Sequence, residues 1–100
     1  MAEEKCMCKR RTLRSDKDKK SLLNRLKRIE GQVRGIINMV EQDAYCNDVL
    51  IQSAAVNAAM NAFNRELLGA HIHHCVADDI RNGRDEVIDE LMLTLQKLMK

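Results

Sequence analysis

Apolar residues recur at intervals of three and four along most of this chain, which is the spacing of one face of an α-helix. The first series runs from residue 22 to residue 40 and predicts one amphipathic helix. It consists of Leu22, Leu23, Leu26, Ile29, Val33, Ile36, Ile37 and Val40. Ser15 stands at the expected N-cap and Asp18 follows three residues later, in the manner of a capping box. The first helix should therefore begin at about Ser15.

Two further helices follow by the same criterion. After a turn at residues 41–45, a second apolar series predicts a long helix from about residue 47 to about residue 81. Asn82-Gly83 is a helix C-cap signal, and a third helix should begin near Asp85. The apolar stripe of that helix consists of Val87, Ile88, Leu91, Met92, Leu95, Leu98 and Met99. The third helix is too short to be stable alone, so we expect it to pack on its neighbours.

Composition supports an all-α fold with a three-helix protomer. The 100 residues are 45% apolar and include four Gly, one Phe, one Tyr and neither Pro nor Trp. An aliphatic core of this kind suits helix packing between subunits, and a chain of this size buries only about 60 to 70% of its unfolded surface alone. We expect residues 1–14 to form a flexible basic tail and residues 15–100 to form one all-helical domain.

The chain has no apolar run near the length of about 20 residues that a membrane span requires, and no secretory segment. We therefore predict a cytoplasmic protein without a membrane partner. Four Cys in a secreted chain would suggest disulfides, but in the cytosol reduced thiols with metal or redox roles are favoured.

The charge is distributed unevenly. Residues 1–28 contain eleven Lys or Arg against four Asp or Glu, a balance of +7, whereas the other 72 residues contain six against eleven, a balance of −5. A basic end on a slightly acidic body is typical of a protein that binds a polyanion, although such a face can also be simply solvated. Because aromatic side chains for base stacking are almost absent, duplex phosphates are favoured over single strands. The candidate DNA contacts are Arg14, Lys17, Arg25, Lys27, Arg28 and Arg34.

The end of the second helix carries the candidate metal ligands. His71 and Cys75 are four residues apart, which places both side chains on one helix face. Cys46 lies at the start of the same helix, and the 25 residues from Cys46 to His71 span about 38 Å at 1.5 Å per residue. A second copy packed antiparallel about a two-fold axis would bring Cys46 of one chain beside His71 and Cys75 of the other. The spacing therefore predicts an obligate dimer with metal sites at the subunit boundary.

The donor types favour Cu(I). Two thiolates and one imidazole make three ligands, whereas a closed structural zinc site needs four. Zinc remains open if His73 or His74 supplies a fourth ligand, but we expect both at the surface or beside the ligands. Tyr45 adjoins Cys46 and would either hydrogen-bond to the ligands or serve in packing.

Cys6 and Cys8 form a Cys-x-Cys pair in the tail. With Met7 between them, they are a possible accessory site for Cu(I) or Zn(II). The alternative is that both are incidental thiols of a disordered segment, and we favour this alternative.

The segment 25–35, which reads Arg-Leu-Lys-Arg-Ile-Glu-Gly-Gln-Val-Arg-Gly, is followed by Tyr45-Cys46 and by His71-x-x-x-Cys75. This pattern resembles the copper-sensitive operon repressor family of bacterial metalloregulators, over about residues 17–98. The resemblance implies an antiparallel dimer with an intersubunit helix bundle, which pairs again into a dimer of dimers. It implies Cu(I) held by Cys46 of one chain and His71 and Cys75 of the other, with Tyr45 and Glu90 around these ligands.

The resemblance also implies that the copper-free protein binds operator DNA and releases it when the inducer binds. We therefore predict a Cu(I)-responsive transcriptional repressor, a homotetramer in the cytoplasm, that derepresses copper-resistance genes. One alternative is a copper storage or transfer protein without operator binding. Another is a family relative that senses zinc, nickel or a sulfur species. We do not expect an enzyme, because the chain has no Gly-rich phosphate loop, no Ser/His/Asp constellation and no Cys-x-x-Cys pair.

Overall fold

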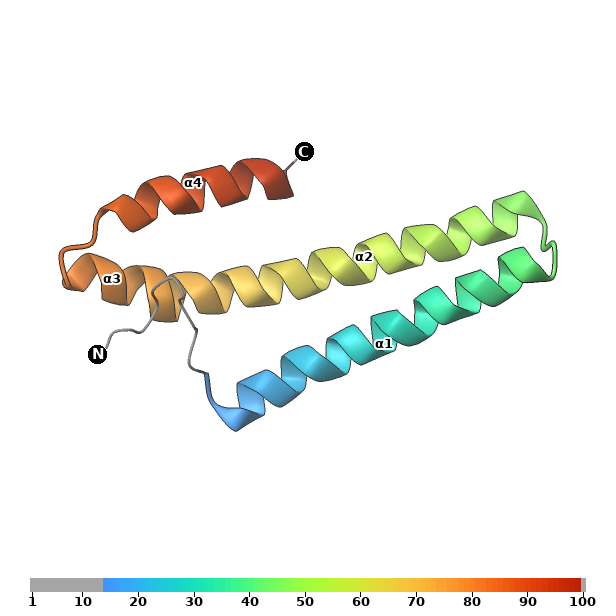
Figure 1. Cartoon of the computed structure of the whole chain (residues 1–100), viewed down its shortest axis with the longest axis horizontal. Coiled ribbons are helices and arrows are strands. Elements are labelled where there is room, and N and C mark those ends of the chain that lie inside the picture. Colours follow the sequence, from blue (N-terminus) through green and yellow to red (C-terminus); the bar gives the residue numbers. More distant parts are fainter. Residues whose placement is uncertain (1–13, 100) are drawn as a thin grey trace. The chain divides into compact units, whose positions relative to one another are not determined.

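The computed structural model of the chain describes residues 14–99, and over this range all regular secondary structure is helical (Figure 1). The elements are α1 (Asp16–Glu41), α2 (Cys46–Ala70), the π-helical segment η1 (His71–Val76), α3 (Ala77–Arg81) and α4 (Glu86–Leu98). Because α2, η1 and α3 follow one another without a break, the described backbone forms three helical rods. The predicted all-α, three-helix protomer is thereby confirmed.

The expected amino-terminal tail falls almost entirely outside the described residues. Of residues 1–14 the structure describes only Arg14, which lies half-buried just before α1. The possible accessory metal site at Cys6 and Cys8 also lies outside the described residues. The tail, and the single domain expected over residues 15–100, therefore stay predictions.

The start of α1 follows from its capping residue. Ser15 has an extended backbone, and its hydroxyl oxygen accepts a hydrogen bond from the Asp18 N–H at 3.1 Å. This bond satisfies one of the amide groups that have no partner within the first turn of a helix. Asp16 and Asp18 add negative charge where the helix dipole is positive. The helix therefore begins where the sequence predicts.

The described residues fall into two compact units, and the first comprises residues 14–67. Within it, α1 and the beginning of α2 run in opposite directions, as Figure 1 shows. The turn between them contains Asp43 in the left-handed region, with φ 56°, a conformation that Asp tolerates better than most residues. The Ala44 N–H donates to the Met39 carbonyl at 2.9 Å and closes the end of α1. Leu22 and Ile29 are the buried residues of α1.

The second unit comprises the described residues from 68 onward. Its chain reverses after α3 at Gly83, which has φ 83° and so occupies a conformation that favours glycine. The Gly83 N–H donates to the Ile80 carbonyl at 3.0 Å, and α4 begins three residues later. Asn82-Gly83 therefore ends the second rod as the sequence predicts. Cys75, Val76 and Val87 form the buried apolar residues of this unit.

The buried core of the described chain is small. Five apolar residues of the described chain are buried, each no more than 9% exposed, namely Leu22, Ile29, Cys75, Val76 and Val87. In contrast, Ile37 and Val40 on α1 are 52% and 59% exposed, and Leu50 and Ile51 on α2 are 65% and 57% exposed. Apolar side chains of this size, left uncovered in number, are typical of a surface that a partner covers. Among the described helices, none combines the length and apolar character that a membrane crossing needs.

The π-helical segment is the main departure from the predicted second helix. Within it the hydrogen bonds span five residues, as in the bond from the Ala77 N–H to the Ile72 carbonyl. A π-turn accommodates an extra residue, so the side chains beyond it are rotated relative to those before it. Apolar periodicity does not reveal such an insertion, because the residues on either side remain helical. Short π-segments are rare and occur frequently at functional sites.

Candidate metal centre and nucleic-acid interface

Cys46 is presented at the amino-terminal end of α2. It is the first residue of the helix, and its thiol is free and exposed. The preceding residue, Tyr45, starts the helix through its carbonyl, which accepts the N–H groups of Asp48 at 3.0 Å and Val49 at 3.2 Å. The Tyr45 side chain is 72% exposed. The Cys46 thiol and the Tyr45 phenol are therefore both accessible to a group outside this chain.

His71 and Cys75 lie at the first and fifth positions of the π-helical segment. His71 is half-buried, and Cys75 is a buried, reduced thiol. An α-helical turn has 3.6 residues and a π-turn slightly more than four, so residues four apart lie about one turn apart in either geometry. The imidazole and the thiol thus stay on the same side of the rod. His73 and His74, in the same segment, are exposed, as expected for residues at the surface.

One described chain does not assemble the three predicted ligands. Among the described residues, no three side chains of His, Cys, Asp or Glu come close enough together to hold a metal ion. The 25 residues of α2 form one continuous helix between Cys46 and the π-helical segment, about 38 Å at 1.5 Å per residue. The placement of Cys46 against His71 and Cys75 across a subunit boundary therefore remains a prediction.

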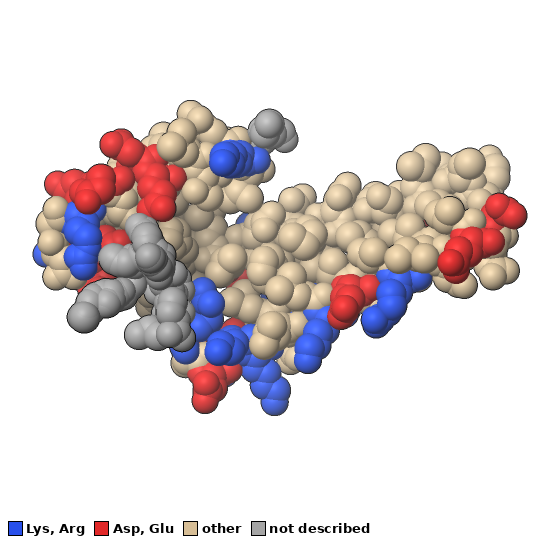
Figure 2. Space-filling model, viewed as in Figure 1, with Lys and Arg blue, Asp and Glu red and all other residues tan. Residues whose placement is uncertain are grey.

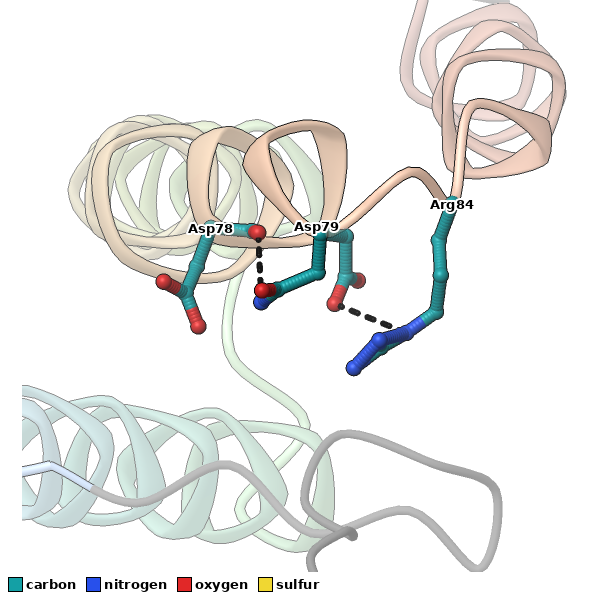
Figure 3. A network of polar contacts seen from close by, with 4 residues as sticks. Asp78, Asp79 and Arg84 are labelled. Carbon is teal, nitrogen blue, oxygen red and sulfur yellow. Dashed lines mark hydrogen bonds and ion pairs between the residues drawn. The ribbon is translucent and has the colours of Figure 1, made fainter.

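Glu90 lies on α4 and is exposed. It lines a hollow of about 270 Å³ together with Asp79, Arg84, Glu86 and Val87. Figure 3 shows the Arg84 guanidinium approaching the Asp79 carboxylate, and both residues line this hollow. On the neighbouring turn, the Asn82 side-chain amide donates to the Asp78 carbonyl at 3.0 Å. Neither the Asp79–Arg84 pair nor the hollow is evident from helical periodicity.

A basic face runs along the first half of α1. Three of the predicted DNA contacts, Lys17, Arg25 and Arg28, line a shallow hollow of about 420 Å³. Its other lining residues are Lys20, Ser21 and Asn24, which follow at helical spacings of three and four. Figure 2 shows Lys and Arg side chains following α1 on the face in view. We call this set the α1 basic face.

The remaining predicted DNA contacts lie elsewhere on the amino-terminal part of the described chain. Lys27 and Arg34 are exposed on α1 but do not line the basic face, and Arg14 precedes the helix. Ser21 and Asn24 are not among the sequence-predicted contacts, although their spacing from Lys17 and Arg28 would have placed them on the same side of the helix. Uncharged polar side chains between cations are suited to contacts with phosphates or with base edges.

Arg25 is held by an acid from the second helix. Its Nη2 lies 3.5 Å from the Glu66 Oε1, and the two side chains are 40% and 49% exposed. Glu66 lies on α2 five residues before His71. A phosphate at Arg25 would compete with this carboxylate for the guanidinium, so Glu66 would oppose the predicted DNA contact there.

Comparison with known proteins gives one family. The family described as "Metal-sensitive transcriptional repressor" matches residues 18–97. The chain is 54% identical over 88 residues to the copper-sensing transcriptional repressor CsoR of Bacillus subtilis (strain 168), which covers 87% of each protein. It is 46% identical over 65 residues to the copper-sensing transcriptional repressor RicR of Mycobacterium tuberculosis, over 65% of this chain and 68% of that protein.

Solved structures agree with the sequence comparison. The fold is similar to the copper-sensing repressor CsoR with Cu(I) from Geobacillus thermodenitrificans NG80-2, with a TM-score of 0.85 and 42% identity over 90% of this chain and 95% of that one. It is also similar to the nickel-responsive transcriptional regulator InrS, with a TM-score of 0.68 and 34% identity over 88% of this chain and 97% of that one. Both similarities cover most of this chain.

Proposed function

The chain belongs to the family of metal-sensitive transcriptional repressors, and we propose on this basis that it is a Cu(I)-responsive repressor. It binds double-stranded operator DNA in the copper-free form and dissociates when Cu(I) binds, which derepresses copper-resistance genes. The observation that carries the proposal is the presence of Cys46, His71 and Cys75 in a chain that resembles copper-sensing repressors over most of its length. Because its target is operator DNA, we place it in the cytoplasm.

Cys46, His71 and Cys75 would hold the copper ion. Both cysteines are reduced, and thiolates with one imidazole are the soft, low-coordinate donor set that Cu(I) prefers. Zinc in a structural site would need a fourth ligand, and nickel favours more nitrogen donors.

The ligand set requires two copies of the chain. We propose an antiparallel dimer in which Cys46 of one protomer lies beside His71 and Cys75 of its partner, and a pairing of two such dimers into a tetramer. The exposure of Ile37, Val40, Leu50 and Ile51 supports an assembly that covers them. The small core of the single chain gives further support, since few apolar side chains stabilise it alone.

The regulatory mechanism is a linkage between two binding equilibria. Copper lowers DNA affinity only to the extent that it binds the DNA-incompetent arrangement more tightly. When bound, Cu(I) supplies bonds that join the two ends of the second helical rod across the dimer. Cys75 lies in the π-helical segment, and α3 and α4 follow it along the chain. We propose that α4, through Glu90, passes the change at this segment to the basic faces of the tetramer.

The proposal predicts a copper-dependent loss of DNA binding. A duplex that the copper-free protein selects from a random-sequence pool, here called the selected duplex, should bind about 5- to 150-fold more weakly after addition of Cu(I), the range of typical allosteric coupling. Fluorescence anisotropy under anaerobic conditions measures both affinities, with Zn(II) and Ni(II) as comparison metals.

Other outcomes would replace the proposal. If no duplex is selected and copper still binds, the chain is a storage or transfer protein. If Ni(II) or Zn(II) releases the duplex and Cu(I) does not, it is a sensor of another metal.

The Arg25–Glu66 ion pair gives a second prediction. Changing Glu66 to Gln should strengthen binding of the selected duplex by up to about fivefold, because an exposed ion pair contributes about 0.2 to 1 kcal/mol. The freed guanidinium would then be available to a phosphate. Glu30→Gln is the matched control, since it removes an exposed acid from α1 without releasing Arg25. If Glu30→Gln strengthened DNA binding as much as Glu66→Gln does, the effect would come from the change in net charge and not from the release of Arg25.

A further inference from the structure

Asp79 is the one buried charged residue among those that the structure describes. Its side chain is 9% exposed, and its Oδ1 lies 3.7 Å from the Nε of Arg84, whose side chain is 38% exposed. A carboxylate that leaves water is stabilised only if it is paired or hydrogen-bonded. The Asp79–Arg84 ion pair is therefore a specific feature of this fold rather than a chance surface contact.

The same two residues are also joined through the backbone. The Arg84 N–H donates to the Asp79 carbonyl at 2.8 Å, across the turn that contains Gly83. Gly83 adopts φ 83°, and glycine is conformationally permissive. Without further contacts, this turn would let α4 move relative to α3. The backbone bond and the ion pair therefore both span the turn that connects α3 and α4.

The Asp79–Arg84 ion pair and backbone bond connect two parts of the chain that concern the metal. Asp79 follows Cys75 by four residues, so the two lie about one turn apart on the second rod, and both are buried. Arg84 precedes α4, the helix that carries Glu90. Asp79, Arg84, Val87 and Glu90 line one hollow. The ion pair thus connects the helical turn that follows Cys75 to the hollow that Glu90 also lines.

We infer that Asp79 and Arg84 are positioning residues, which fix the start of α4 against the turn that follows Cys75 and so pass the state of the metal centre to α4 and Glu90. The inference rests on the proposed function. Asp79 does not bind copper, because its carboxylate is a hard donor and is already paired with Arg84. Its contribution is to the coupling between copper and DNA, not to either affinity alone.

The test compares copper and DNA binding in Asp79→Asn, which keeps the size of the side chain and removes its charge. Cu(I) affinity, measured by competition with a chelator, and copper-free affinity for the selected duplex should both remain at the wild-type level. The ratio of DNA affinities without and with Cu(I) should fall by about 2- to 30-fold, the range for substitutions that alter coupling. Arg84→Gln, which keeps a donor for Asp79, should give the same loss and serves if Asp79→Asn folds poorly.

Two controls separate positioning from general stability. Asp78→Asn makes the same substitution at the adjacent, exposed position and should leave the ratio unchanged. Asp79→Glu restores the carboxylate and should retain most of the coupling. A purely structural role would instead lower the melting temperature and weaken both copper and DNA binding without changing the ratio, and that result would overturn the inference.

The outcomes also distinguish this inference from the proposed function. If wild-type protein does not release the selected duplex when Cu(I) binds, the proposed function fails and there is no coupling to transmit. If wild-type protein releases the duplex and both Asp79→Asn and Arg84→Gln release it equally well, only the role of the Asp79–Arg84 pair is refuted.

Discussion

Changing Cys46 to Ser should give a folded repressor that binds the selected duplex but no longer responds to copper. Cys46 is exposed at the start of α2, so the substitution should change the free energy of unfolding by no more than about 0.5 kcal/mol. A hydroxyl is a poor donor for Cu(I). Loss of a residue that only supports a ligand weakens metal binding by about 10- to 100-fold, so loss of a direct ligand should weaken copper binding by more than this. Chelator competition and anisotropy measure the two affinities.

The matched control is Asn47→Ser, at the next exposed position of α2, which should bind copper normally. Mixed assemblies test the sharing of the site between chains. If Cys46 of one chain meets His71 and Cys75 of another, Cys46→Ser and Cys75→Ser subunits combined in one dimer form one complete site and one empty site. In a random 1:1 mixture about half of the dimers are of this mixed kind, so high-affinity copper binding restored to about a quarter of the wild-type stoichiometry would support the shared site. Failure of the mixture to recover any binding would contradict it.

Binding of the selected duplex should fall by about 10³- to 10⁵-fold between 50 and 200 mM salt if the assembly contacts six to ten phosphates. The double substitution Lys17→Ala/Arg28→Ala should make this dependence shallower, because the slope of log affinity against log salt decreases by about one whenever a cation that binds a phosphate is removed. Both residues line the α1 basic face. Anisotropy titrations at four salt concentrations give the slopes for wild type and variant.

A change in net charge alone is tested with Arg81→Ala/Lys97→Ala. This variant removes the same charge from exposed positions on α3 and α4. Its slope should match that of the wild type. If the control lowers the slope as much as the α1 variant does, the phosphates are not bound by the α1 basic face. Circular dichroism of both variants establishes that the helices are retained.

The helices of this protein could be predicted because their causes are local. The apolar spacing of residues 22–40 and of residues 87–99 places one face of a helix toward a core whatever that core is. Ser15 and Gly83 mark helix boundaries through interactions that reach no further than three or four residues. For the same reason the three rods begin and end close to the positions that the sequence predicts.

The prediction of a Cu(I) site rests on residue types and spacing alone. His71 and Cys75 are four apart on a helix, and two thiolates with one imidazole are a donor set that suits Cu(I). In contrast, Val33, Ile37 and Val40 belong to the apolar stripe of α1 but are exposed in the single chain. Periodicity identifies the side of a helix that is to be covered, but not whether the same chain or another copy covers it.

The sequence alone was sufficient for the three helical rods and their boundaries, since each depends on neighbours along the chain. The roles of Cys46, His71 and Cys75 as ligands stay a prediction. The π-helical segment at His71–Val76, the burial of Asp79 against Arg84 and the capture of Arg25 by Glu66 required the folded structure. The two ion pairs depend on which side chains meet after turns and between helices, and for the buried Asp79 also on the balance between desolvation and pairing. Those meetings are set in three dimensions, so no residue spacing expresses them.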